Sequence, residues 1–280
     1  MRDNLSGHPT MKTRIISFFI QKGGTGKTAC VANIGAGLAR RGRRVLLIDL
    51  DPQSNLALCL GATPGPVTSY DILTGRGAGW AGGVVDVYQG EEAARAGGCL
   101  ALLPAARDLA AVDREITGEA GHETRLRDAI RAEAAGRFDY ILFDNPPTVN
   151  AAVINGLCAA REVFAPVRAD FLSIAGTAQL RDTIAAVKAG GLNPGLRLSG
   201  IILTFFDGRT NLSRLAAEQL REAFPGAVFG AAIRETVTIG EAPASGRDVF
   251  SYAPGSGAAL DFMRLCAEIE NGQAQPLRTS

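Results

Sequence analysis

Residues 18–28, FFIQKGGTGKT, decide how the rest of the chain is interpreted. The apolar run at residues 15–20 predicts a buried strand, and the pattern at residues 29–40 predicts a helix. The turn between them holds three glycines, which let the backbone take left-handed angles and point several N–H groups inward. Because the helix directs the positive end of its dipole at the same point, this segment predicts a phosphate-binding loop.

The loop departs at one position from the pattern G-x-x-x-x-G-K-[ST]. Gln21 stands where the first glycine belongs, and a second lysine, Lys22, follows it. The intact end of the pattern predicts that Lys27 reaches the outer phosphates and that the Thr28 hydroxyl holds Mg²⁺. Only four of the 29 basic residues are lysines, so two in this loop indicate a need for a compact ammonium group. The residues expected to contact the nucleotide are Lys22, Gly23, Gly24, Thr25, Gly26, Lys27, Thr28 and Ala29.

Two further predicted strands end in carboxylates. The apolar run at residues 44–50 leads into Asp49 and Asp51, and the run at residues 140–144 ends at Asp144, before two prolines. The carboxyl ends of parallel strands meet at one edge of an open α/β sheet, where ligands bind. We therefore expect Asp49 and Asp51 to project together at this edge, and Asp144 to belong to the Mg²⁺ site.

The rest of the chain alternates predicted strands and helices. Strands are expected at residues 99–103, 162–167 and 198–205, and helices at residues 122–135, 174–188 and 258–269. The glycine-rich residues 61–98 are expected to form loop with one short helix near residues 70–73. This alternation predicts an α/β fold with a doubly wound, mostly parallel sheet flanked by helices. We expect a disordered leader at residues 1–11, a single domain at 12–270 and a polar tail at 271–280.

The composition excludes several classes of protein. With 280 residues, 46% hydrophobic and 20% charged, the chain is typical of a globular protein with a substantial core. No apolar run approaches the roughly 20 residues that cross a bilayer, so we expect a cytoplasmic protein without a membrane partner. Five scattered cysteines without a C-x-x-C pair, and two histidines, indicate neither a disulfide framework nor a zinc site nor histidine catalysis.

With these motifs in place, the chain resembles the ParA/MinD family of P-loop ATPases, whose deviant Walker A motif carries the same extra lysine. The run D-L-D-P-Q-S-N at residues 49–55 is similar to the family's switch segment D-x-D-P-Q-x-N. The run D-N-P-P at residues 144–147 resembles its D-C-P-P, with Asn145 in place of the cysteine. Residues 204–212, TFFDGRTNL, and residues 241–246, EAPASG, resemble runs of the ParA (Soj-like) branch.

This resemblance implies ATP and Mg²⁺ as ligands, and a homodimer that forms when ATP binds. Lys22 would contact the nucleotide of the partner subunit and offset charge that develops in phosphoryl transfer. Asp51 would orient the attacking water and touch the Mg²⁺ shell. The adenine would lie near Arg234 and Thr236, where the run IRETVTIG at residues 233–240 departs from the family's I-P-R-N-V-R-L-S.

The function that the resemblance implies is that of a partition ATPase with slow, partner-stimulated hydrolysis. Such a protein binds DNA without sequence preference and segregates plasmid or chromosome DNA with a ParB-like centromere-binding partner, associated with the nucleoid. The candidate phosphate contacts are Arg209, Arg214 and Arg247.

Two alternatives remain open. An arginine linked to DNA binding in relatives falls on Thr238, which favours a ParA-like positioning ATPase for a non-DNA protein cargo. A nitrogenase-reductase-like iron–sulfur protein would need paired cluster cysteines, and Cys99 and Cys158 lack the matching surroundings.

Overall fold

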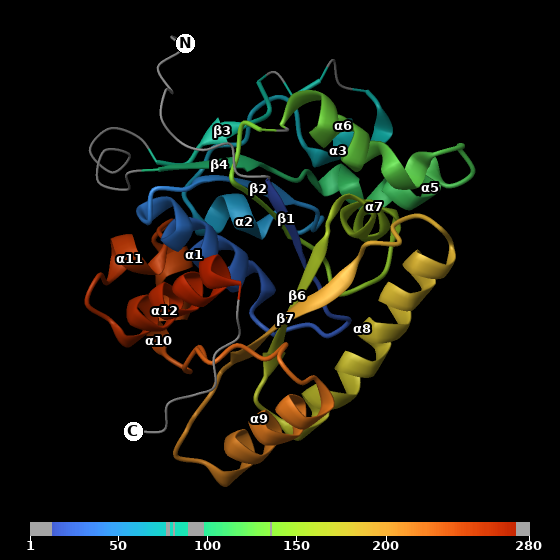
Figure 1. Ribbon diagram of the computed structural model, residues 1–280. Helices are drawn as coiled ribbons and strands as arrows, with labels where there is room; N and C mark the ends of the chain where they lie inside the picture. The colour runs from blue at the N-terminus through green and yellow to red at the C-terminus, as the bar shows by residue number, and fades with distance from the viewer. Residues whose placement is uncertain (1–12, 77–78, 81, 89–97, 135, 273–280) are drawn as a thin grey trace.

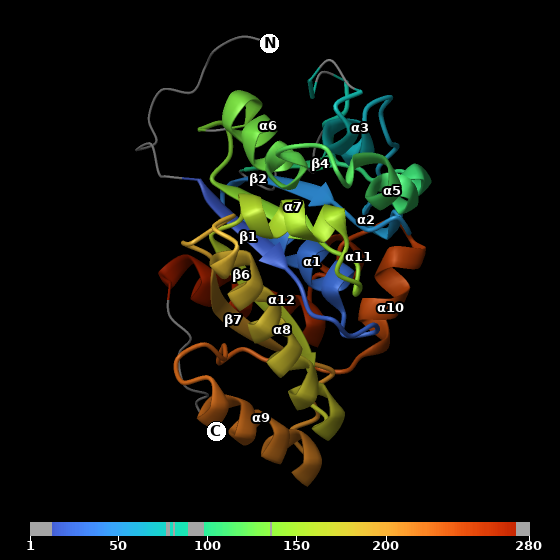
Figure 2. The same cartoon turned by 90° about the vertical axis from the view of Figure 1, so that its right-hand side faces the viewer.

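The computed structural model describes residues 13–76, 79–80, 82–88, 98–134 and 136–272, which form a seven-stranded sheet with helices on both faces (Figures 1 and 2). The strands are β1 (Arg14–Phe18), β2 (Arg44–Asp49), β3 (Val85–Asp86), β4 (Cys99–Leu103), β5 (Tyr140–Asp144), β6 (Glu162–Arg168) and β7 (Arg197–Thr204). The helices are α1 (Lys27–Arg40), α2 (Asn55–Cys59), α3 (Ser69–Thr74), α5 (Val112–Ile116), α6 (Arg125–Glu133), α7 (Ala151–Ala159), α8 (Phe171–Ala189), α9 (Asn211–Ala223), α10 (Val237–Ala244), α11 (Val249–Tyr252) and α12 (Gly257–Asn271). Short 3₁₀ helices span Arg107–Ala111 and His122–Thr124.

The strand order is β3-β4-β2-β5-β1-β6-β7, and every neighbouring pair is parallel except β3 and β4. The register places Phe18 opposite Asp144 and Asp144 opposite Asp49, so three strands end in one row. The predicted doubly wound, mostly parallel sheet is confirmed. Its carboxyl edge holds the segments that carry the predicted motifs, as expected for an open α/β sheet.

Helices cover both faces of the sheet, and each face has its own apolar cluster. On one face Ile34 of α1 and Phe262 of α12 pack with neighbours from α10 and α11. On the other, Leu126 of α6, Leu157 of α7 and Leu180 of α8 pack together. Figure 1 shows these two groups of helices on opposite sides of the sheet. Burial on both faces explains why the central strands are continuous apolar runs rather than alternating ones.

Two glycines bring α1 unusually close to its neighbours. A Cβ on Gly35 would lie 2.7 Å from a methyl carbon of Leu47, and one on Gly37 would lie 2.6 Å from the Cys266 Sγ. Only glycine allows these approaches without a shift of the neighbours. Because α1 begins at the phosphate loop, this close packing of α1 on β2 and α12 also restrains the position of the loop.

The structure departs from the predicted outline in several places, and the helices α2, α5, α10 and α11 were not predicted. Residues 85–86 form the edge strand β3 within the stretch expected to be loop, because two residues are too few to show an alternating pattern. Helices α7 and α9 were not predicted, although Asn150 and Thr210 cap them through the N–H groups of Val153 and Ser213. Helix α12 continues to Asn271, one residue into the predicted tail. The predicted leader lies outside the described residues, as does the tail from residue 273.

No helix in the described part of the chain combines the length and the apolar composition that a membrane crossing requires.

Candidate nucleotide-binding site

The phosphate loop joins β1 to α1 at the carboxyl edge of the sheet. Gly24 and Gly26 take left-handed angles (φ 70° and 81°), as predicted, whereas Gly23 does not. Gly26 caps α1, and the first turn of this helix contains no acidic residue, so its positive end is open to an anion. The Thr204 hydroxyl donates to the Thr25 carbonyl at 2.9 Å and ties the loop to the end of β7.

The two loop lysines have different environments. Lys27 is buried, and its Nζ donates to the Lys22 carbonyl at 3.0 Å. Burial lowers the pKa of Lys27, and the carboxylates of Asp144 and Asp51 oppose this shift. Lys22 is partly exposed, and its Nζ lies 3.4 Å from the Asp170 Oδ1 at the start of α8. The Lys27 ammonium group therefore lies inside the loop, and the Lys22 ammonium group lies at its rim.

Asp144 is a buried carboxylate beside the loop. Neither of its oxygens has a hydrogen bond of normal geometry among the described residues, although the Thr28 hydroxyl is close enough to lower its pKa. Burial raises the pKa of Asp144 to about 7, and the charge of Asp51 adds to this rise. Mg²⁺ binds through one or two carboxylates together with water and phosphate oxygens. Orphaned carboxylate oxygens facing Thr28 and Lys27 fit such a site.

Asp49 and Asp51 were expected to project together, but their side chains have different surroundings. The Asp49 carboxylate is fully buried and accepts hydrogen bonds from the N–H groups of Asp51 (2.9 Å) and Leu56 (3.3 Å). Burial and the nearby Asp144 raise its pKa. Asp49 thus holds the backbone that follows β2. Asp51 is half-buried and accepts from the Gln53 N–H at 2.9 Å, and its charge acts on Lys27 and Asp144.

Asn145 connects two strands of the site, a role that sequence reasoning missed. Its side chain is fully buried, and Nδ2 donates to the Ser17 Oγ and to the Phe18 carbonyl, both at 2.9 Å. The residue that follows Asp144 is therefore bonded to the strand that leads into the phosphate loop. The only sequence signal was a polar side chain at the end of a buried strand.

A mostly apolar hollow of about 460 Å³ adjoins the loop, between the start of α1, the end of β7 and residues 233–240. Both predicted adenine contacts, Arg234 and Thr236, line it. The Arg234 guanidinium is paired with Asp261 at 2.8 Å, and the Thr236 hydroxyl caps α10. An apolar hollow with a few polar groups at its wall suits a planar base whose phosphates lie in the adjoining loop. Its apolar lining includes Cys30, Phe205, Ile233, Ile239 and Phe262.

The three arginines expected to contact DNA lie outside this site. The Arg209 side chain is 91% exposed and forms a two-bond pair with Asp207, both bonds at 2.9 Å. This pairing holds the pKa of Asp207 down at about 2. Arg214 donates to the Asn211 Oδ1 at 2.6 Å, and Arg247 is exposed beyond α10.

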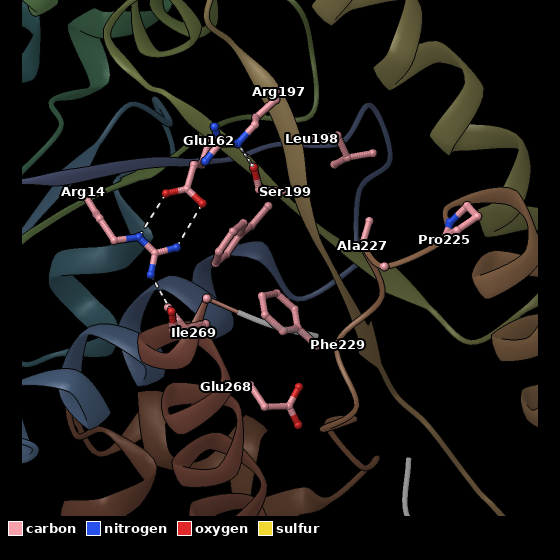
Figure 3. Close-up of a pocket in the computed structure, with 13 residues that line it drawn as sticks. Arg14, Glu162, Arg197, Leu198, Ser199, Pro225, Ala227, Phe229, Glu268 and Ile269 are labelled. Carbon is pink, nitrogen blue, oxygen red and sulfur yellow. Dashed lines mark hydrogen bonds and ion pairs between the residues drawn. The ribbon is translucent and has the colours of Figure 1, made fainter. Parts of the chain in front are cut away.

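A second hollow, of about 500 Å³, lies at the opposite edge, where β1, β6 and β7 begin (Figure 3). Figure 3 shows the Arg14 guanidinium between the Glu162 carboxylate, with two bonds of 3.0 Å, and the Ile269 carbonyl. The rings of Phe164 and Phe229 pack edge to face at 5.2 Å beside them. Arg14 and Glu162 satisfy each other, and this edge is not the one where open α/β sheets bind ligands.

Comparison with known proteins places this chain in a family. The model of the AAA domain family matches residues 13–198. The chromosome partitioning protein ParA of Caulobacter vibrioides is 38% identical over 259 residues, covering 91% of this chain and 93% of the relative. The chromosome-partitioning ATPase Soj of Thermus thermophilus is 40% identical over 258 residues, covering 92% and 96%. This chain belongs to the ParA/MinD family of P-loop ATPases.

A solved structure also resembles this ParA/MinD chain. Cobyrinic acid a,c-diamide synthase from Mycobacterium smegmatis, with bound ADP and magnesium, matches with a TM-score of 0.78 and 32% identity. The match covers 96% of this chain and 100% of that one. The family resemblance predicted from the sequence motifs is confirmed.

Most of the predicted site residues of this ParA/MinD chain come together at one sheet edge. The charges of Asp51 and Asp144 act on Lys27 of the phosphate loop, and Arg234 and Thr236 line the hollow that adjoins the loop. Thr204 and Phe205 were missed as parts of the site. The bond from Thr204 spans 179 positions of the chain, so no local pattern could indicate it.

Proposed function

We propose that this protein is a partition ATPase that binds ATP and Mg²⁺, dimerises on ATP and hydrolyses it slowly. The observation that carries the proposal is the phosphate loop with two lysines, Lys27 buried inside it and Lys22 at its rim. Similarity to ParA and Soj over more than nine-tenths of the chain supports it. A ParB-like centromere-binding partner would stimulate the hydrolysis.

Each residue of the site has a part in this proposal. The loop amides and Lys27 bind the phosphates, and Lys22 reaches the nucleotide of the partner subunit. Thr28, Asp51 and Asp144 hold Mg²⁺, which when bound offsets the negative charge of the phosphate oxygens. Asp51 also orients the attacking water. The hollow lined by Arg234 and Thr236 takes the base.

We also propose that the dimer binds DNA through its phosphates, in the cytoplasm and on the nucleoid. Three exposed arginines in each subunit supply the positive charge, namely Arg209, Arg214 and Arg247. Contacts to phosphate release counterions, so affinity falls steeply with salt. Six such contacts in a dimer correspond to a log–log salt slope of about −5.

The test is binding to duplex DNA of arbitrary sequence, with ATP or ADP, over a series of salt concentrations. We expect tight, salt-sensitive binding with ATP only, and a shallower slope when Arg209, Arg214 and Arg247 are all replaced by alanine. Arg137→Ala is the control, because it removes an exposed arginine elsewhere on the surface. A flat salt response, or equal binding with ADP, would contradict DNA partition.

A second candidate function is the positioning of a protein cargo. It is favoured by Thr238, which bonds with Thr236 at the start of α10 and offers no positive charge. It is also favoured by the pairing of Arg209 with Asp207, which neutralises one DNA candidate. ATP-dependent dimerisation without DNA binding would support this candidate over partition. The neighbouring gene separates them as well, since a small DNA-binding protein indicates partition.

A further inference from the structure

Phe205 has an unusual backbone conformation beside the base hollow. Its φ is +51°, and Ser54 is the other non-glycine residue with a positive φ in the described ranges. A bulky side chain rarely adopts this conformation, so the surrounding structure must hold it there. The Phe205 ring lines the hollow and lies 3.6 Å from where a Cβ on Gly26 would stand. A strained residue therefore forms the wall between the base hollow and the phosphate loop.

Three direct contacts lead from this wall to Lys22. The Arg168 guanidinium lies 4.0 Å from the centre of the Phe205 ring, a cation–π contact. The Arg168 Nε is 3.4 Å from the Asp170 Oδ2, and the Asp170 Oδ1 is 3.4 Å from the Lys22 Nζ. Asp170 is therefore shared by two cations, one of which is stacked on the wall of the hollow.

These contacts are weak enough to rearrange. The side chains of Lys22, Asp170 and Arg168 are 30%, 34% and 37% exposed, and both ion pairs are long. Ion pairs this exposed change an equilibrium by no more than about fivefold. A ligand shifts such an equilibrium only if it binds one arrangement better than the other. A base bound in the hollow would meet that condition, because Phe205 is part of the lining of the hollow.

We propose that Phe205, Arg168 and Asp170 couple base binding to the release of Lys22. A base entering the hollow displaces the Phe205 ring, and Arg168 then turns its planar guanidinium fully onto Asp170. A guanidinium that binds a carboxylate through two N–H groups outcompetes a single ammonium, so Lys22 is released. Phosphates alone leave the hollow empty and Lys22 held. This inference rests on the proposed action of Lys22 on the partner's nucleotide.

The test compares Mg-ADP with Mg-pyrophosphate, which supply the same phosphates with and without a nucleoside. Neither carries a third phosphate, so the proposed dimerisation does not interfere. Reductive methylation of lysines, followed by mass spectrometry, reports the accessibility of Lys22, with Lys188 as the internal reference. Mg-ADP and Mg-pyrophosphate are each used at a concentration that gives the maximal increase in the melting temperature of the protein. We expect the Lys22 to Lys188 labelling ratio to rise up to about fivefold with ADP and to stay unchanged with pyrophosphate.

Three variants test the individual contacts. Arg168→Ala should abolish the rise with ADP, because the guanidinium that replaces Lys22 at Asp170 is then absent. Asp170→Asn should give a high ratio in every state. Phe205→Leu keeps an apolar wall without a ring, so it should also lose the rise, and it serves if Arg168→Ala does not fold. Arg137→Ala removes a comparable arginine–aromatic contact, 5.9 Å from the ring centre of Phe138, and should behave as wild type.

Two results would overturn the coupling: equal ratios with ADP and pyrophosphate in the wild type, or an undiminished rise with ADP in Arg168→Ala. A separate measurement tests the proposed function. Light scattering with ATP reports dimerisation, so a base-dependent ratio without an ATP dimer supports the coupling and contradicts the proposed function. An ATP dimer without a base-dependent ratio does the reverse.

Discussion

Lys22 and Lys27 are five positions apart in one loop, yet the Lys27 side chain is buried and the Lys22 side chain is partly exposed. Burial lowers the pKa of Lys27, whereas the carboxylates of Asp144 and Asp51 favour its charged form. Lys22 keeps contact with solvent and with Asp170. The same residue type thus serves two tasks, because folding places one copy inside the loop and the other at its rim.

Alanine substitutions should separate these tasks. Lys27→Ala should abolish nucleotide binding, because a buried positive charge at the phosphates is lost. Lys22→Ala should bind nucleotide normally but lose dimer-dependent hydrolysis by about 100-fold or more, the scale of one lost transition-state contact. Fluorescent-nucleotide titration and ATPase rate against protein concentration measure both effects. Wild-type hydrolysis by Lys22→Ala would contradict the action on the partner's nucleotide.

The pKa of Asp144 makes the stability of the nucleotide-free protein depend on pH. Burial raises this pKa from 3.8 to about 7. The folded protein therefore keeps a proton that the unfolded chain has lost, so stability falls as pH rises from about 4 and levels above about 7. Asp144→Asn should reduce this fall and stabilise the nucleotide-free protein at pH 8 by up to about 4 kcal/mol.

Urea unfolding at pH 5 and pH 8, without nucleotide, measures this effect. The same variant should lose Mg²⁺-dependent nucleotide binding, because an amide is a weaker Mg²⁺ ligand than a carboxylate. An equal gain in stability at both pH values would show that Asp144 is not the titrating group.

At the scale of elements, the site depends on how β1, β5 and α1 are held together. Asn145, at the end of β5, bonds to Ser17 and Phe18 of β1. The glycines of α1 allow it to pack closely on β2 and α12. Asp144 and the phosphate loop are therefore positioned by contacts between elements, rather than by the local sequence of either.

Asn145→Ala should disturb this arrangement in a specific way. It leaves the Phe18 carbonyl buried without this donor, which costs about 1–3 kcal/mol of stability. It should also weaken Mg-nucleotide binding about tenfold, because Asp144 is no longer held against β1. Asn193→Ala is the matched control, since its Nδ2 bonds to the carbonyls of Leu157 and Ala160, away from the site.

Urea unfolding and nucleotide titration of both variants measure these effects. The control should lose stability but keep its nucleotide affinity. If both variants bind nucleotide equally well, Asn145 is a structural residue only.

At the scale of the whole molecule, the proposed function needs two subunits. Asp51 is half-buried and its charge acts on Lys27 and Asp144, so Asp51→Ala should remove the proposed orientation of the attacking water but keep the phosphate loop. We expect this variant to bind ATP, to hydrolyse it at least about 100-fold more slowly, and to accumulate as a dimer. Light scattering after addition of ATP measures the dimer. A monomeric, ATP-bound Asp51→Ala would contradict a switch driven by hydrolysis.

The sequence by itself determined the fold class, the phosphate loop and the acidic strand ends. These are recorded in local patterns, since buried strands need apolar runs and a phosphate needs glycines followed by a helix start. Comparison with the pattern G-x-x-x-x-G-K-[ST] also identified Lys22 as the additional lysine of the loop. The resemblance singled out Asp51, but only the structure shows that the Asp49 carboxylate accepts hydrogen bonds from the backbone N–H groups of Asp51 and Leu56.

Only the tertiary structure decided which distant residues meet. The bond from Thr204 to the loop, the contact of Arg168 with Phe205 and the pair of Arg234 with Asp261 join segments that are separate along the chain. Such pairs form when strands and helices pack. The sequence contains many arginines and acidic residues, and it does not indicate which of them meet. The physical reason is that a hydrogen bond or ion pair depends on geometry in space, whereas periodicity and local motifs record only what neighbours along the chain require.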